Sequence, residues 1–379
     1  MKRICFGLFL TGWCVTSLAQ NRIVKTLTDT ITIEKRKGIV TYVRPVASIN
    51  TYYRLYIGAN YNIVHKSSGE KSYSAKHTLG LNYSISENSF SPYYSANFPK
   101  ALADWNLSFL AGYDQSRRLN FFGPGNESQQ LTSDREFYRF RTQNQYARMS
   151  IDKFFASHHH VDVSLLYNAI KVKDREDHFL STSKDNINPS LLDWQYYLSP
   201  QLTYSYLHLN EQLIPTKSFD ITTTLSYNGN LNRSESSFMR LTTDMNLYLP
   251  LPKPFSFLVH VGGATLTGDP DFYQLNSIGG STTLRGYDRF RFYGKTAFYN
   301  QNELRWIPYV KTSFYKGHLG LLALYDQGRV WQPGETSNKM HSAYGAGIIV
   351  SPFNKAVITA AYAISNEEHR IHLRVGKLF

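Results

Sequence analysis

Few side chains of this 379-residue chain are spaced for catalysis or metal binding. His158, His159 and His160 are consecutive, and neighbouring side chains of an extended strand point to opposite faces, which favours a solvated turn over a metal site. Residues 174–177 form a charge run that is more typical of an outer loop than of paired catalytic carboxylates. No Ser/His/Asp nucleophile motif is found. We therefore expect no enzyme activity, no cofactor and no metal ion.

The N-terminus has the pattern of an export signal. Lys2 and Arg3 form a positive segment, residues 4–15 are apolar, and Ser17-Leu18-Ala19 is a small-x-small cleavage site. We therefore expect residues 1–19 to be a signal peptide and the mature chain to begin at Gln20.

The two cysteines also lie in this signal. Cys14 could instead be the lipidated residue of a lipoprotein, although Trp13 precedes it where a small residue would be needed. With Cys5 also inside the signal, the exported chain has no cysteine left for disulfide or thiol chemistry.

Composition points to a membrane without helical spans. The net charge of +13 falls to +11 when Lys2 and Arg3 leave with the signal, and the basic residues are spread singly. This distribution favours outer-membrane lipid with anionic head groups over nucleic acid as the partner. Mean hydropathy is −0.36 and no long apolar run follows the signal. With 15% aromatic residues, the chain suits a β-barrel with interfacial aromatic girdles.

The strand pattern is clearest at the C-terminus. With Lys377 as the exception, apolar and polar residues alternate there: Ile371, Leu373, Val375 and Phe379 share one face, and His372, Arg374 and Gly376 share the other. Upstream, further segments are long enough for a tilted strand to cross a bilayer. They are residues 38–49, 52–64, 73–86, 89–98, 105–114, 136–152, 160–173, 193–208, 217–228, 237–249, 255–266, 296–308, 316–331, 340–351 and 356–364.

These segments predict an all-β fold, a transmembrane antiparallel β-barrel of about sixteen strands over residues 38–379. Connections alternate between short turns such as 250–254 and 352–355 and long polar loops at 115–135, 174–192 and 267–293, which all fall on the outer side. Residues 20–37 are expected to form a short periplasmic segment outside the barrel.

Three motifs in the C-terminal third resemble those of the BamA/TamA superfamily of outer-membrane assembly and secretion proteins, over roughly residues 255–379. The long loop contains Gly279, Gly280, Leu284, Arg285, Gly286 and Tyr287, similar to the signature of the family's inward-folded loop. Residues 301–305 and 324–331 resemble two of its strand motifs, with Gln301 and Leu324 in place of asparagine and an aromatic residue. Residues 120–128 also resemble a loop found in one branch of the superfamily.

The resemblance implies that Arg285 binds a carboxylate of the inner wall, Asp326, with Glu303 as a second acceptor, because a guanidinium offers five donors in a planar fork. Leu322 and Leu324 have the same parity as Asp326 and would face the lumen with it unless a bulge intervenes near Gly328. A C-terminal Phe379, preceded by Gly376 and Leu378, resembles the insertion signal of outer-membrane barrels.

The stretch before the barrel is too short for a periplasmic polypeptide-binding (POTRA) domain, where relatives capture substrate. Two functions are therefore expected as alternatives. The first is outer-membrane protein insertion, assembly or translocation, with periplasmic or outer-membrane accessory proteins supplying the missing function in trans. The second is a pore or structural barrel without insertase activity.

Overall fold

The computed structural model describes residues 31–36, 38–50, 52, 54–66, 73–173, 175–182, 189–208, 214–215, 217–354 and 356–375. The expected signal peptide of residues 1–19 lies outside these ranges. The expected insertion signal at Gly376, Leu378 and Phe379 also lies outside the described residues.

Almost all regular structure is β-strand. The strands are β1 (Ile31–Arg36), β2 (Ile39–Asn50), β3 (Arg54–Lys66), β4 (Tyr73–Ser84), β5 (Ser89–Leu102), β6 (Trp105–Asn120), β7 (Arg139–Phe155), β8 (His159–Lys173), β9 (Gln195–His208), β10 (Ser218–Asn230), β11 (Phe238–Pro250), β12 (Phe255–Gly268), β13 (Asn276–Ile278), β14 (Phe292–Gly294), β15 (Thr296–Trp306), β16 (Tyr309–Lys311), β17 (Lys316–Trp331), β18 (His341–Pro352), β19 (Ile358–Ser365) and β20 (His369–Val375). The short helices are α2 (Phe179–Thr182), η2 (Pro189–Leu192), η3 (Ser234–Ser236) and η4 (Phe272–Gln274).

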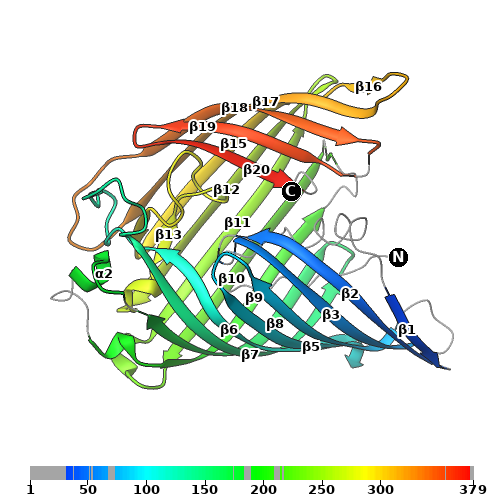
Figure 1. Cartoon of the computed structure of the whole chain (residues 1–379), viewed down its shortest axis with the longest axis horizontal. Coiled ribbons are helices and arrows are strands. Elements are labelled where there is room, and N and C mark those ends of the chain that lie inside the picture. The colour runs from blue at the N-terminus through cyan, green and yellow to red at the C-terminus, as the bar shows by residue number, and fades with distance from the viewer. Residues whose placement is uncertain are drawn as a thin grey trace.

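The strands form an antiparallel barrel wall. Of the 18 strands in the main sheet, β1 and β16 are short, which leaves sixteen longer strands and confirms the predicted fold and strand number among the described residues. The long strands of the wall pair in chain order, so that β12 pairs with β15 and β15 with β17, while the short β16 pairs with β17. β13 and β14 form a separate small sheet. Figure 1 shows the wall curving around a lumen, with β13 inside it and α2 at the end where the long loops lie.

The N-terminal end of the sheet begins before the expected boundary at residue 38. Ile31–Arg36, which the sequence placed outside the barrel, forms β1 and pairs antiparallel with β2. At the other end of the sheet, β20 pairs with β19. In the part of the chain that the structure describes, no strand pairing joins these two ends.

Side chains alternate between lumen and exterior as the sequence pattern requires. In β17, Leu322, Leu324 and Asp326 are buried, whereas Leu321 and Tyr325 are exposed. The register of β17 with β15 and with β18 has no shift, so no bulge reverses the parity near Gly328. The leucines therefore do face inward, where they pack in an apolar cluster with residues 307, 349, 357, 361 and 363.

In the described ranges, no helix is long and apolar enough to span a bilayer. Three long connections lie at the end of the barrel that carries α2. They are residues 121–138, here called the cap loop, the described residues 175–182 and 189–194, and residues 269–295, here called the lumen loop. The tilted rings of Phe121 and Phe272 pack with centroids 4.6 Å apart, so the cap loop and the lumen loop share one apolar cluster.

Candidate functional site in the barrel lumen

The lumen loop enters the barrel as a small hairpin. Its arms β13 and β14 pair in antiparallel register, and its tip spans residues 279–291. Gly279 has φ +124°, and a Cβ there would stand 2.1 Å from the Asp288 carbonyl oxygen, so only glycine permits this turn. Gly286, with φ +85°, likewise lies against Ala343 of the wall. Leu284 and Tyr287 of the motif are fully buried beside them.

Arg285 lies between the two carboxylates that the family resemblance implied. Its Nε donates to Asp326 Oδ2 at 2.7 Å and its Nη2 to Asp326 Oδ1 at 2.6 Å, which is a bidentate pair. Its backbone N–H also donates to Asp326 Oδ2, at 3.0 Å. Nη1 donates to Glu303 Oε1. Burial lowers the pKa of Arg285, but the charges of Glu303 and Asp326 outweigh it and hold the pKa above its usual value.

Glu303 has a second cation partner that the sequence did not indicate. Arg305, two residues away on the same face of β15, donates to Glu303 Oε2 from Nε at 2.8 Å and from Nη2 at 2.6 Å. Both carboxylate oxygens of Glu303 are therefore occupied, one by the loop and one by the wall. Residues 303 and 305 are two positions apart in one strand and so point to the same face, which is the feature of the sequence that could have predicted this contact.

Gln301 joins the same cluster. Its Nε2 lies 3.3 Å from the Ser281 carbonyl oxygen in the loop and 3.4 Å from Asp326 Oδ2. On its other side, its Oε1 accepts from His260 Nδ1 at 3.0 Å. The side chain that replaces the family's asparagine thus spans from the wall to the loop.

Tyr287 fastens the loop tip to the last hairpin. Its hydroxyl donates to Asn366 Oδ1 at 2.6 Å, and Ser365 Oγ donates to the Gly286 carbonyl oxygen at 2.8 Å. Burial, with the charge of Glu367, raises the pKa of Tyr287 to about 12, so the hydroxyl keeps its proton for this bond.

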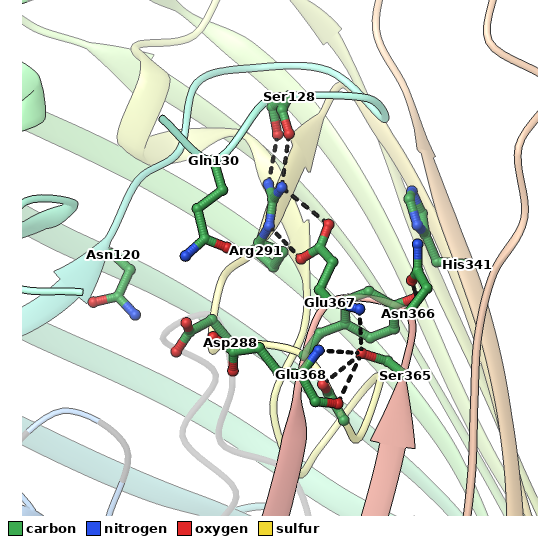
Figure 2. A network of polar contacts seen from close by, with 12 residues as sticks. Asn120, Ser128, Gln130, Asp288, Arg291, His341, Ser365, Asn366, Glu367 and Glu368 are labelled. Atoms are coloured by element: carbon green, nitrogen blue, oxygen red, sulfur yellow. Dashed lines mark hydrogen bonds and ion pairs between the residues drawn. The ribbon is translucent and has the colours of Figure 1, made fainter. Parts of the chain in front are cut away.

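Arg291 binds two other loops at once. Its Nε donates to Glu367 Oε2 at 2.7 Å in the β19–β20 turn, and its Nη1 and Nη2 donate to Ser128 Oγ at 2.9 Å and to the Ser128 carbonyl oxygen at 2.7 Å in the cap loop. Figure 2 shows Arg291 between these two partners. Nearby, Asp288 pairs with Arg370 of β20.

Asn126 secures the cap loop by hydrogen bonds to the β17–β18 connection, a role that the family resemblance of residues 120–128 did not indicate. Its side chain is fully buried. Nδ2 donates to the Lys339 carbonyl oxygen at 2.8 Å, and Oδ1 accepts from the Val330 N–H at 3.0 Å. Its backbone N–H donates to Glu335, at 2.8 Å from Oε1. A single asparagine therefore connects the cap loop with the β17–β18 connection.

The consecutive histidines make separate contacts. His160 Nε2 lies 3.1 Å from Asp152 Oδ2, and His159 Nδ1 lies 2.7 Å from the Tyr204 hydroxyl. Among the described residues no group of three or more His, Cys, Asp or Glu side chains could hold a metal ion.

Comparison with known proteins gives a family and a fold. The model of the Omp85 superfamily domain matches residues 65–379. No curated protein matches the chain. BamA from Haemophilus ducreyi lacking POTRA domains 1–3 has a TM-score of 0.64 and 14% identity, with 92% of this chain and 74% of that chain covered. CdiB from Escherichia coli (TM-score 0.57, 10% identity, 92% and 67% covered) and CdiB from Acinetobacter baumannii (0.54, 12%, 92% and 65%) are also similar. At these identities the solved structures show the fold alone.

Proposed function

Because this chain belongs to the Omp85 superfamily, we propose that its outer-membrane barrel acts in the insertion and assembly of outer-membrane proteins or in protein translocation, with accessory proteins in trans. On this proposal residues 1–19 direct export and are removed, and Gly376, Leu378 and Phe379 direct insertion of the barrel. The barrel works by pairing and passage of polypeptide rather than by bond-making catalysis.

The observation that carries the proposal is the match of the Omp85 superfamily model to residues 65–379, and the position of β1 and β20 at the two ends of the sheet supports it. β1 pairs with β2, and β20 pairs with β19. An unpaired backbone edge in hydrocarbon costs several kcal/mol per group, on the order of the transfer of a peptide amide. A strand of a client protein can satisfy these groups by β-augmentation.

The lumen loop supports the same proposal. Arg285, Tyr287 and Arg291 attach its tip to β17, to β15 and to the turn that leads into β20. Because β20 is one edge of the sheet, the loop contacts bear directly on the position of that edge. A movement of β20 can therefore displace the lumen loop, and a movement of the lumen loop can displace β20.

The test uses disulfide capture of a client at the edge strand. The expected mature chain has no cysteine, so Ile371→Cys in β20 introduces the only thiol into an exposed position. The client is a urea-denatured outer-membrane barrel precursor with one cysteine in its last strand, added to the protein in liposomes together with copper phenanthroline, the oxidant that takes the two electrons released when the two thiols form a disulfide. Tyr344→Cys is the matched control, because it is also exposed but lies in β18, which is paired on both sides.

We expect a disulfide-linked client with Ile371→Cys and much less with Tyr344→Cys. Equal capture at both positions, or no capture at either, would contradict the proposal. No capture together with stable, solute-selective ion conductance would instead identify a pore or structural barrel without insertase activity.

A further inference from the structure

A cavity of about 110 Å³ lies in the lumen, between the inner faces of β6 to β11 and the lumen loop. Tyr273 and Gln274 of η4 form its side toward the loop. It is separate from the contacts of Arg285, because none of Arg285, Glu303 and Asp326 lines it.

The wall of this cavity is rich in uncharged hydrogen-bonding groups. Amide and hydroxyl side chains project into it from successive strands, among them Asn168, Ser199, Gln201, Ser226 and Asn228. Two cations, Arg117 and Arg240, also line it, whereas no aspartate or glutamate is among the described lining residues. The lining is therefore positively charged.

Arg240 is the cation that most needs a partner. It follows the inward parity of β11 and is only 8% exposed. Its Nη2 donates to the Gln274 carbonyl oxygen, and its guanidinium carbon lies 5.0 Å from the centre of the Phe238 ring. Its Nε is buried without a hydrogen-bond partner, and no carboxylate of the described residues pairs with it. A buried guanidinium is expected to have an anionic partner, because desolvation of an uncompensated charge is unfavourable.

Other lumen arginines have the partner that Arg240 lacks. Arg148 donates to Asp162 Oδ1 at 2.6 Å, and Arg285 binds Asp326 and Glu303. The carboxylate next to the cavity is also already engaged: Asp271 accepts from the Tyr197 and Tyr273 hydroxyls at 2.5 and 2.9 Å and pairs with Arg233. No carboxylate oxygen is therefore directed toward Arg240 from the lining.

The opposite side of the cavity offers both a second cation and a free acceptor. The Arg117 guanidinium lies 4.2 Å from the centre of the Tyr52 ring and is 7% exposed. Asn168 is 6% exposed, and its Oδ1 has no hydrogen-bond partner. A ligand with an anionic group for the arginines and a hydroxyl donor for Asn168 would match both kinds of group.

We propose that this cavity binds an oxyanion, a phosphate or a carboxylate, either free or carried by a hydroxyl-rich ligand of the sugar class. The anion lies against Arg240 and Arg117, because a guanidinium can donate two parallel hydrogen bonds to two oxygens of one carboxylate or phosphate. The amides and hydroxyls of β8, β9 and β10 bind sugar hydroxyls or the remaining oxygens. This site does not depend on the proposed function of the barrel in protein insertion.

The experiment measures binding to the detergent-solubilised full chain by isothermal titration calorimetry. The probes are inorganic phosphate, glucose 1-phosphate, glucuronate and, as the neutral comparison, glucose. We expect saturable binding of at least one anion, and glucose bound at least tenfold more weakly than that anion. Arg240→Gln should raise the Kd of the bound anion at least tenfold, whereas Arg148→Gln, which alters a carboxylate-paired lumen arginine outside the cavity, should leave it unchanged.

Phosphate bound as tightly as glucose 1-phosphate identifies a free oxyanion as sufficient, and binding of the sugar anions alone identifies a hydroxyl-rich ligand. The proposal is overturned if no anion binds, if glucose binds as tightly as the anions, or if Arg240→Gln leaves the Kd unchanged. Should Arg240→Gln fail to fold, as judged by its migration unheated on a gel, Asn168→Asp serves instead, because its added negative charge must weaken binding of an anion.

Discussion

When the lumen loop folds into the barrel, the guanidinium of Arg285 loses its water and gains the carboxylate oxygens of Asp326 and Glu303. The contribution of Arg285 to stability therefore depends on both carboxylates being present. A buried ion pair adds little when it is compared with a well-packed apolar pair, but the removal of one partner leaves an uncompensated charge. Asp326 is fully buried and Glu303 is 3% exposed, so neither can turn to solvent when the arginine is lost. The pair therefore fixes the position of the loop more than it stabilises the wall.

Arg285→Ala should detach the loop without unfolding the barrel. The loss of one partner from a buried pair costs ~3–5 kcal/mol, while the strand ladders are untouched. We expect residues 267–293 to become sensitive to protease added from outside, with altered conductance or lost assembly activity. Asp326→Ala should have a similar effect, and the double variant should be less than additive. Fully additive effects or a wild-type cleavage pattern would show that the two residues do not act as a pair.

Gln301→Asn should loosen the loop more mildly. The shorter side chain cannot reach both His260 Nδ1 and the Ser281 carbonyl oxygen, and each neutral hydrogen bond contributes about 1 kcal/mol. Hydrogen exchange of residues 279–291 should be faster than in the wild type but slower than in Arg285→Ala. Asn302→Ala, on the opposite face of the strand, is the control and should leave this exchange unchanged. Unchanged exchange in Gln301→Asn would mean that the side chain does not hold the loop.

At the scale of elements, Asn126 connects the cap loop to β17 and to the β17–β18 connection by hydrogen bonds. Asn126→Ala would leave the Val330 N–H and the Lys339 carbonyl group without partners, and each unsatisfied buried group costs about 1–3 kcal/mol. We expect residues 121–138 to be cleaved by added protease while the strands stay intact. The exposed Gln129→Ala is the control, and equal cleavage of the two variants would contradict the assignment.

The strands could be predicted from sequence because their signal is local. Alternation over about ten residues marks each one, and the parity of Leu322, Leu324 and Asp326 correctly placed all three on the lumen side. The contact of Arg285 with Asp326 came from family resemblance, since alternation says nothing of which wall residue a loop will reach. The contacts of Asn126 could not be predicted, because Glu335 is 209 residues away and the geometry that unites them exists only after the barrel has curved.

At the scale of the whole molecule, entry into the membrane is expected to depend on the last residue. Deletion of Phe379 leaves the alternating β20 intact but removes the proposed insertion signal. The yield of barrel that migrates faster unheated than boiled, and that fractionates with the outer membrane, should fall. Phe379→Tyr keeps an aromatic end and should restore most of it. Equal yields from the deletion and the wild type would count against this reading of the terminus.

The pairing order of the wall determines the order in which parts of the barrel fold and open. The long strands of the wall pair with the long strands next to them in the chain, so each new hairpin closes a short span and the wall can grow stepwise. The contacts of the cap loop and the lumen loop need β17, the β17–β18 connection and the β19–β20 turn together, so they must form last and can open first. Leu284 and Asn126 are as buried as any strand residue. Their amide hydrogens should nevertheless exchange well before those of β7 to β12. In this protein, the burial of a residue will therefore not predict how rarely its surroundings open to solvent.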